Sequence, residues 1–503
     1  MLFIIIKQSM ISDLLQRICV IITLDEVLEM FNNIKEVQDF IKKKEVKYID
    51  FKMIDLKGRW KHLSIPAENF KDSIMTDGIG FDGSNYGYAD VKNSDMVFVP
   101  DLSTAVIDPF VEETTLTMIG DVYVIREPHN IPFDQYPRNI AKSALNYLKE
   151  TGIGDEMIIG PEYEFHVFDS ISRKVGSHES FYKITSAESY QSASDEYSLG
   201  FHNRYNGGYH CDIPNDETYN LRNEICRNLK LFGVDVKYHH HEVGGSGQLE
   251  IEVELGDLMK LADDTLTAKY VIRNTAVING YTATLMPKPI YGEAGNGMHV
   301  HMLIRKDGIN VFYGDEYAGL SQTALYFIGG LLKHVRALCA FTNPSTNSYK
   351  RLLPGFEAPV TVGYALANRS SVIRIPGYAK NSDKKRFELR SPDATCNPYL
   401  AYSAILMAGL DGVVNKIDPK DHNWGPFDFN LYDLSDEEKK HLEHLPKTLD
   451  EALDELEKDN EFLKVNGVFP ESLINNWIAT LRKEARKVRN IPNPVEFDLY
   501  YDL

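Results

Sequence analysis

The feature that most constrains this chain is a set of strand-like segments in which glutamates alternate with apolar residues. In "GPEYEFHVF", Glu162, Glu164 and His166 share one face of an extended strand, because successive side chains of a strand point to opposite faces. The other face carries Tyr163, Phe165 and Val167. A half-buried antiparallel strand with a solvent-facing polar side gives the same pattern. This segment alone therefore leaves two interpretations open, an ordinary surface or a site.

Three further segments repeat the alternation. They are "GQLEIEVEL" with Gln248, Glu250, Glu252 and Glu254 on one face, "GMHVHMLI" with His299 and His301, and "RFELRSPD" with Arg386, Glu388 and Arg390. Glu242 lies shortly before the first of them, ahead of a glycine-rich turn. Carboxylates gathered on one sheet repel one another, so water, arginine or a metal ion must compensate their charge. Carboxylate-rich sets with few histidines favour Mg²⁺ or Mn²⁺ over zinc.

Several arginines stand in unusual surroundings. "YKRLLPGFEAP" carries Arg351 ahead of a Pro-Gly turn and Glu357, and "NRSSVIRIPG" carries Arg369 and Arg374. Arginine forks match phosphate and carboxylate oxygens, although salt bridges to the same glutamates would also account for them. Together with a divalent metal they indicate phosphoryl transfer. The sequence has no Walker A motif and no kinase signature, so we expect an ATP site of another type.

Bulk composition excludes some classes of protein. With 54 Lys and Arg against 73 Asp and Glu, the chain carries a net charge of −19, which argues against nucleic acid and anionic membrane surfaces as partners. Its 5 cysteines are scattered, which indicates free thiols in a reducing compartment such as the cytoplasm. The first 24 residues are apolar but interrupted by charges, and they match neither a membrane span nor a signal peptide.

The pattern along the chain predicts two domains after an N-terminal extension. Residues 33–66 read as a helix followed by two strands, and "REPHNIPFDQYP", with three prolines, marks a boundary. We expect the extension over residues 1–29, a smaller domain over 30–130 and a larger one over 131–503; Met30 is an alternative start. Within the larger domain, residues 170–208 read as a long surface loop, and 257–282 and 318–341 as helices.

The ordered set of motifs resembles type I glutamine synthetase from about residue 35 to the C-terminus. The motifs are "FDGS", "GPEYEF", "HHHEV…GQLE", "MPKP", "GMHVH", "NPSTNSYKRLLPGFEAP", "NRSSVIRIP", "RFELRSPD" and "NPYLA". The resemblance implies an α+β fold with a small β-grasp-like domain, followed by a catalytic domain whose curved antiparallel sheet is flanked by helices. It also implies a two-step reaction in which glutamate and ATP give γ-glutamyl phosphate, and ammonia then displaces phosphate to give glutamine.

The resemblance further implies a role for individual residues. Two metal ions would be held by Glu164, Glu242 and Glu250 and by Glu162, His299 and Glu388. ATP would be bound by His301, Arg369, Arg374 and Arg386. Glutamate would be bound by Gly295, Arg351 and Arg390. Glu357 would lie on a flap that shields the acyl phosphate, Arg369 would act in catalysis, and Asp82 of a neighbouring subunit would bind ammonium. The site would then form only in a ring, and two six-membered rings would stack into a dodecamer.

Some positions depart from the family pattern or stay open. Asn85 replaces the second serine of "DGSS", Ala294 replaces the first asparagine of "NGSGMH", and Leu303 replaces a serine near the nucleotide. Tyr432 matches the tyrosine that is adenylylated in some bacterial members, but an ordinary surface tyrosine is an equal alternative. The first two changes keep a γ-glutamyl ligase for another amine, such as a polyamine or ethanolamine, as the second hypothesis. A non-catalytic ring-forming relative is the third.

Overall fold

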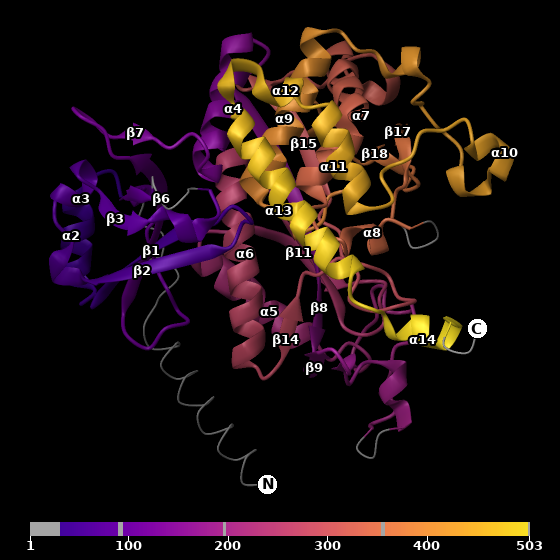
Figure 1. Cartoon of the computed structure of the whole chain (residues 1–503), viewed down its shortest axis with the longest axis horizontal. Helices are drawn as coiled ribbons and strands as arrows, with labels where there is room; N and C mark the ends of the chain where they lie inside the picture. The colour runs from indigo at the N-terminus through magenta and orange to yellow at the C-terminus, as the bar shows by residue number, and fades with distance from the viewer. Residues whose placement is uncertain (1–30, 89–93, 195–197, 354–357, 501–503) are drawn as a thin grey trace. The chain divides into compact units, whose positions relative to one another are not determined.

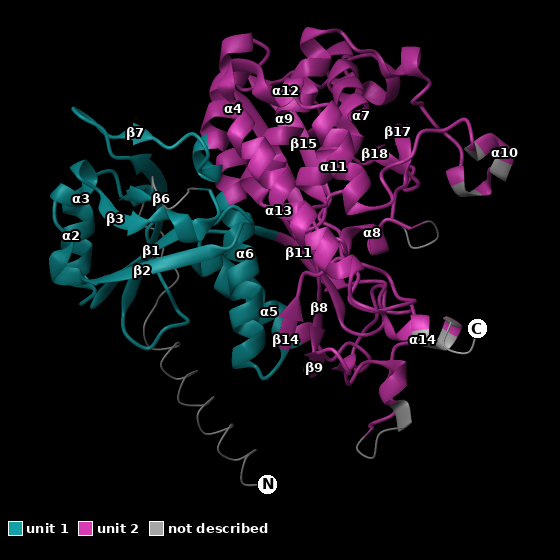
Figure 2. Cartoon of the chain, viewed as in Figure 1, with its two compact units in different colours: residues 1–139, 220–236, 263–281 teal, residues 140–219, 237–262, 282–503 magenta. Residues whose placement is uncertain are grey.

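The computed structural model describes residues 31–88, 94–194, 198–353 and 358–500 (Figure 1). The expected N-terminal extension and Glu357 lie outside these residues. The chain divides into two compact units (Figure 2). Unit 1 comprises residues 1–139, 220–236 and 263–281, and unit 2 comprises residues 140–219, 237–262 and 282–503.

Unit 1 is built on a mixed seven-stranded sheet with the order β2-β1-β6-β4-β3, on which β5 and β7 pair with β6. The strands are β1 (Tyr48–Ile54), β2 (Trp60–Pro66), β3 (Ile79–Asp82), β4 (Asp95–Pro100), β5 (Val106–Ile107), β6 (Thr115–Val124) and β7 (Ile131–Pro132). The helices are α2 (Ile34–Lys43), α3 (Ser73–Thr76), α5 (Tyr219–Leu231) and most of α6 (Leu258–Ile278). The Asn33 side chain accepts from the backbone N–H of Glu36 and so begins α2. The helix and two strands expected over residues 33–66 are confirmed.

Unit 2 is built on a ten-stranded sheet with the order β11-β12-β8-β15-β19-β18-β17, which β13, β14 and β16 extend at the side. Its strands are β8 (Glu156–Phe168), β11 (Val236–His241), β12 (Gln248–Val253), β13 (Gly256–Asp257), β14 (Thr282–Thr284), β15 (Val300–Lys306), β16 (Ile309–Asn310), β17 (Thr361–Leu366), β18 (Ser371–Ile375) and β19 (Phe387–Leu389). Strands β17 and β18 run parallel, whereas β12, β8, β15, β19 and β18 are antiparallel neighbours. The α+β fold class expected from the sequence is confirmed.

Unit 2 also contains most of the remaining helices. They are α4 (Pro137–Thr151), α7 (Gln322–Thr342), α8 (Ser348–Arg351), α9 (Pro398–Val414), α10 (Asp436–Lys439), α11 (Leu449–Lys458), α12 (Glu461–Lys464), α13 (Glu471–Arg489) and α14 (Pro494–Tyr500). Short 3-10 helices are η2 (Ala67–Asn69), η3 (Gly83–Tyr86), η5 (Leu102–Thr104), η6 (Tyr190–Ser194), η7 (Tyr317–Gly319), η8 (Ser382–Lys384), η9 (Pro419–His422), η10 (Leu431–Asp433) and η11 (Val465–Gly467). The helices α7, α9, α11 and α13 pack together (Figure 1), and Trp477 of α13 stacks on Phe341 of α7.

Helices α7 and α9 approach each other backbone to backbone. A Cβ atom on Gly330 would lie 2.2 Å from the carbonyl oxygen of Ala408, and one on Gly412 would lie 2.5 Å from the backbone nitrogen of Gly330. Helix α7 is long and apolar enough to cross a membrane, but 83% of its most apolar window is buried inside the unit. We therefore interpret α7 as the central helix of the core.

One expectation about local structure is wrong. Residues 170–208 are not one long loop, because β9 (Ser170–Val175) and β10 (Ser180–Thr185) pair as a hairpin and η6 follows them. The strands have exposed side chains on both faces, for example the adjacent Arg173 and Lys174, so the period-two signal of a half-buried strand is missing. The helices expected over 257–282 and 318–341 are present as α6 and α7.

Candidate active site

Strand β8, which carries Glu162, Glu164 and His166, is buried on both faces. On the apolar face of β8, Tyr163 and Phe165 are 0% exposed. On the polar face, Glu164 is 7% exposed and His166 is 0% exposed. The polar face of β8 is therefore not exposed to solvent. Strand β8 pairs with β12 in a register that places Glu250 opposite Glu164. Like charges directly opposite each other destabilise a sheet, so protonation, water, an arginine or a metal ion must compensate these carboxylates.

A cavity of about 380 Å³ lies over this face of the sheet. Its acidic and imidazole side chains are Glu162, Glu164, His240, Glu242, Glu250 and His299. Its arginines are Arg351, Arg369, Arg374 and Arg390. The remaining lining includes Asn206, Tyr209, Tyr238, Gln248, Ala294, Gly295 and Tyr378. The cavity thus joins a negative floor to positive side chains, which suits an anionic substrate held through a metal ion.

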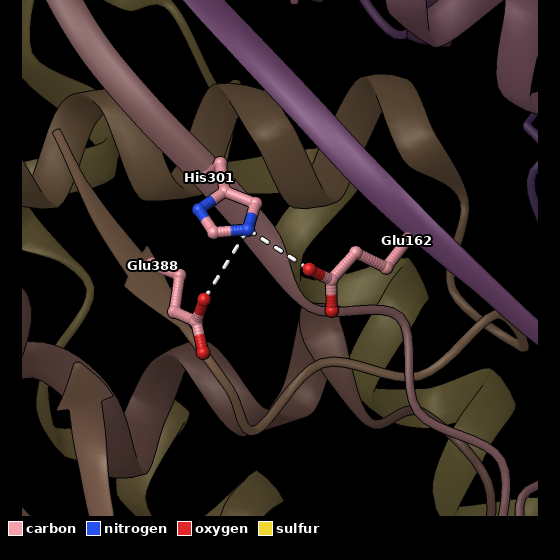
Figure 3. Close-up of side chains that lie close together, drawn as sticks. All are labelled: Glu162, His301 and Glu388. Carbon is pink, nitrogen blue, oxygen red and sulfur yellow. Dashed lines mark hydrogen bonds and ion pairs between the residues drawn. The ribbon is translucent and has the colours of Figure 1, made fainter. Parts of the chain in front are cut away.

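Three neighbouring strands supply one group of possible metal ligands (Figure 3). Glu162 of β8, His301 of β15 and Glu388 of β19 point toward one another. The His301 Nε2 atom lies 2.9 Å from Glu162 Oε1 and 3.2 Å from Glu388 Oε2. His301 and Glu388 are register partners on antiparallel strands, which explains their closeness.

The environment keeps both carboxyl groups of this first set ionised. Burial alone would raise the pKa of Glu162, but hydrogen bonds from His299 and His301 leave it well below the usual value. Burial is likewise outweighed at Glu388, where His301 and the guanidinium groups of Arg390 and Arg374 lower the pKa to about 2. Ionised carboxylates are the form that binds a metal ion.

A second group of possible ligands comes from β11, the turn after it, and β12. It consists of His240, Glu242 and Glu250. Burial raises the pKa of Glu250 well above its usual value, and the nearby charges of Glu162, Glu164 and Glu242 raise it further. A divalent cation would relieve this repulsion, and the oxygen-rich set with few imidazoles fits Mg²⁺ or Mn²⁺.

His299 connects the two groups. Its Nδ1 atom lies 2.8 Å from Glu162 Oε2, and its Nε2 atom lies 3.8 Å from Glu164 Oε1. All six residues named for metal binding from the sequence therefore lie around one cavity or in the adjoining Glu388 group. The tightest groups, however, contain His301 and His240, which were not expected as ligands.

The arginines fall into two kinds. Arg374 Nη1 lies 3.0 Å from both oxygens of Glu388, and Arg390 Nη1 lies 2.7 Å from Oε1, so these two form the internal salt bridges that the sequence left as an alternative. Arg351 is buried and donates to the backbone carbonyls of Ser391 and Arg390. Arg369 is exposed and lines the cavity.

The remaining predicted site residues are more dispersed. Arg386 does not line the cavity, but its guanidinium lies 5.6 Å from the ring of Tyr378, which does. Asp82 is an exposed residue of unit 1 that accepts from the backbone of Ser84 and from the amide of Asn85. Glu357 lies outside the described residues, and so does the side chain of Tyr432, whose backbone belongs to η10.

Some residues that line the cavity were not predicted from the sequence. His240 and Glu242 are two positions apart, so the spacing that pointed to Glu162 and Glu164 could have included His240. Asn206 gave no such signal, because it reaches Ala294 from a distant loop: its Oδ1 accepts from the Ala294 backbone N–H at 2.7 Å. The positions of Tyr238 and Tyr378 also depend on tertiary structure.

Comparison with known proteins identifies the family. The family model "Glutamine synthetase, catalytic domain" matches residues 134–500, and "Glutamine synthetase, beta-Grasp domain" matches residues 45–125. The chain belongs to the glutamine synthetase family. It is therefore an enzyme, a glutamate–ammonia ligase, and its family uses ATP and divalent metal ions and forms oligomers.

Individual relatives agree over nearly the whole length. A glutamine synthetase of Methylococcus capsulatus is 45% identical over 474 residues, which cover 93% of this chain and 99% of the relative. A protein of Cupriavidus pinatubonensis named 3-hydroxylaminophenol mutase is 45% identical, covering 94% of this chain and 100% of the relative. The solved glutamine synthetase of Plasmodium falciparum superposes with a TM-score of 0.84 at 29% identity, over 94% of this chain and 99% of that one.

Proposed function

We propose that the cavity of unit 2 is the ligase site and that two divalent ions, Mg²⁺ or Mn²⁺, bind in it. Glu164, Glu242 and Glu250 would hold one ion. Glu162, His299 and Glu388 would hold the other. The observation that carries this proposal is the geometry of the acidic cluster: the ligand atoms of His240, Glu242 and Glu250 lie within 4.8 Å of one another, and Glu250 stands opposite Glu164, so the buried carboxylates need a cation to remain charged. When bound, the ions neutralise the phosphate oxygens and orient ATP toward glutamate.

The side chains of the cavity would position the two substrates for the first step. Arg351, Arg390 and the backbone of Gly295 would hold the carboxylates of glutamate, and His301, Arg369, Arg374 and Arg386 would face the nucleotide. A γ-carboxylate oxygen then forms a bond to the γ-phosphorus of ATP while the bond to ADP breaks. Arg374 and Arg390 both form salt bridges to Glu388, which is 0% exposed. To bind substrate oxygens, each arginine must either use its other N–H groups or release Glu388.

The second step would depend on two further carboxylates. Asp82 would bind ammonium, and Glu357 would take up its proton and shield the acyl phosphate from water. The ammonia nitrogen then bonds to the carbonyl carbon of the γ-glutamyl group, and the bond from that carbon to phosphate breaks. The hydrogen bonds that Asp82 accepts from Ser84 and Asn85 lower its pKa, which supports a permanently ionised group suited to a cation.

Assembly and location are also proposed. Asp82 would reach the cavity of a neighbouring subunit in a six-membered ring, and two rings would form a dodecamer, with residues 30–130 as the smaller domain and 131–503 as the larger one. A cytoplasmic location is supported by the described cysteines, which are all free thiols. Intact-mass measurement of the protein from nitrogen-rich cells tests adenylylation of Tyr432, and an unmodified mass counts against it.

A second candidate is a γ-glutamyl ligase for another amine. It is favoured by Ala294, which stands at the cavity wall beside Gly295 in place of an asparagine of the family pattern and whose backbone N–H donates to Asn206 Oδ1. One assay compares both: the chain is supplied with ATP, Mg²⁺, glutamate and a panel of ammonium, methylamine, ethanolamine and putrescine, while ADP and product are measured. Highest turnover with ammonium supports the first proposal, and highest turnover with an organic amine supports the second. No ADP release with any amine would contradict both.

A further inference from the structure

At one wall of the cavity, which Gln248 lines, three buried polar side chains form a connected set. His166 of β8 and Asn296 are 0% exposed, and Gln248 of β12 is 1% exposed. Burying a polar group costs free energy unless it is hydrogen-bonded, so each of these three side chains needs hydrogen-bond partners. None of the roles proposed above involves these residues.

The orientation of Asn296 fixes the proton of His166. The Asn296 Nδ2 atom donates to the carbonyl of Met286 at 2.8 Å, and its backbone N–H donates to Pro287 at 2.7 Å. The Oδ1 atom therefore faces His166 Nδ1, at 2.9 Å. Because Oδ1 can only accept, Nδ1 carries the proton and donates. The Nε2 atom of His166 has no hydrogen-bond partner among the described residues, so Asn296 is its polar anchor there.

Gln248 extends this set to a metal ligand. Its Nε2 atom lies 3.2 Å from Asn296 Oδ1, 3.0 Å from the Gly295 carbonyl and 3.4 Å from Glu164 Oε2. Its own Oε1 accepts from the Gly244 backbone at 2.7 Å, which fixes the amide. The backbone N–H of Gly297 also donates to Glu164 Oε2, at 2.7 Å. One oxygen of Glu164 is thus held by two donors, whereas Oε1 faces His299 across the cavity.

We propose that His166 and Asn296 are positioning residues that act through Gln248 and the 295–297 backbone to hold Glu164 Oε2 and present Oε1 to a divalent cation. The inference rests on the proposed role of Glu164 as a ligand. His166 and Asn296 do not themselves touch the cation. Hydrogen-bond partners behind a ligand fix its orientation, and their loss changes metal affinity by about 10- to 100-fold. The proposal also gives His166 a role, which its position on the metal-facing side of β8 left unexplained.

Two substitutions of His166 separate its hydrogen bond from its volume. His166→Phe keeps an aromatic ring but removes the donor, whereas His166→Asn places an amide N–H where Nδ1 stands. Binding of Mn²⁺ to the metal-free full chain is measured by electron paramagnetic resonance of the free ion, and thermal melting of the metal-free variants is measured alongside. We expect His166→Phe to weaken the tightest Mn²⁺ site about tenfold and His166→Asn to restore most of that affinity.

An unchanged affinity in His166→Phe would overturn the proposal, and so would an equal loss in both variants, because packing alone would then explain it. The route is tested by Asn296→Ala and the double variant. If His166 acts through Asn296, His166→Phe adds no further loss to Asn296→Ala, whereas additive losses contradict the route. Should His166→Phe not fold, Asn296→Ala decides, since it must lose affinity while His166→Asn does not.

Glu164→Ala distinguishes a failure of the proposed metal set from a failure of the positioning role alone. If it leaves Mn²⁺ affinity unchanged, Glu164 is no ligand and the proposed metal set fails. If it weakens binding while His166→Phe and Asn296→Ala do not, the metal set stands and only the positioning role fails.

Discussion

The close contact between α7 and α9 gives a stability prediction that can be worked out in advance. In Gly330→Ala, the new methyl group would lie 2.2 Å from the Ala408 carbonyl oxygen and 2.6 Å from the Gly412 backbone nitrogen. Real Cβ contacts do not fall below 3.0 Å, so the helices must separate by roughly 0.8 Å. Both obstacles are backbone atoms, so no side chain can rotate away.

The size of the effect follows from two opposing terms. Overpacking a core costs about 3 kcal/mol at the upper end of the usual range, and an alanine inside a helix recovers about 1 kcal/mol of propensity. The net loss in the free energy of unfolding is about 2 kcal/mol. Divided by the unfolding entropy of a unit of this size, it lowers the melting temperature by about 3 °C. Differential scanning calorimetry of the metal-saturated protein measures it.

Gly377→Ala is the matched control. A Cβ there would meet only the Ala367 Cβ atom, at 3.9 Å, which is an ordinary contact, and the backbone is not left-handed. We expect its melting temperature to stay within about 1 °C of the parent. If Gly330→Ala melts like Gly377→Ala, the backbone-to-backbone contact between α7 and α9 does not limit the packing, and the reasoning is refuted.

Three further outcomes are expected. Glu162→Ala should lower turnover at saturating Mn²⁺ by about 100-fold or more, because a metal clamp contributes several kcal/mol; unchanged turnover would exclude Glu162 from the metal set. Asp82→Ala should slow glutamine formation from ammonium far more than acyl-phosphate formation, measured as ammonium-independent ADP release; equal losses would make Asp82 structural. His334 lies 2.9 Å from Asp411 and 2.7 Å from Asp459. Burial lowers its pKa, but these hydrogen bonds outweigh burial and raise it, so its stabilisation is complete below about pH 6.5 and is lost as pH rises through the folded pKa. The melting-temperature difference between the parent and His334→Gln should therefore be larger at pH 6 than at pH 9, and a constant difference would contradict it.

Alternation along single strands carried most of the sequence-based prediction. The period of two placed Glu162 and Glu164 on one side of β8 correctly, because that property depends only on local geometry. The same reasoning could not tell that both sides are buried, since burial depends on which layers cover the sheet. It also treated the sparsely patterned residues 170–208 as a loop, although a hairpin forms there.

The grouping of side chains depended on strand order, which the alternation does not contain. His301 meets Glu388 because β15 and β19 are neighbours, and Arg374 meets the same carboxylate from β18 on the other side. Glu388 therefore collects His301 and Arg374 from two neighbouring strands, in addition to Arg390 from two residues further along the chain. The role proposed for Asn296 was hidden for the same reason, since its partners lie on β8 and β12.

The cross-strand register of β8 and β12 has a consequence for the kinds of change this protein can tolerate. Glu250 faces Glu164 and Glu252 faces Glu162, with Ile251 and Tyr163 turned to the opposite side. A substitution of one glutamate alters one pair, but adding or deleting a single residue within either strand shifts the register beyond that point, which turns the carboxylates there toward the apolar layer and the apolar side chains there toward the cavity. Natural variation and engineering at this site should therefore respect chain length more strictly than residue identity, and tolerated insertions should be confined to the loops.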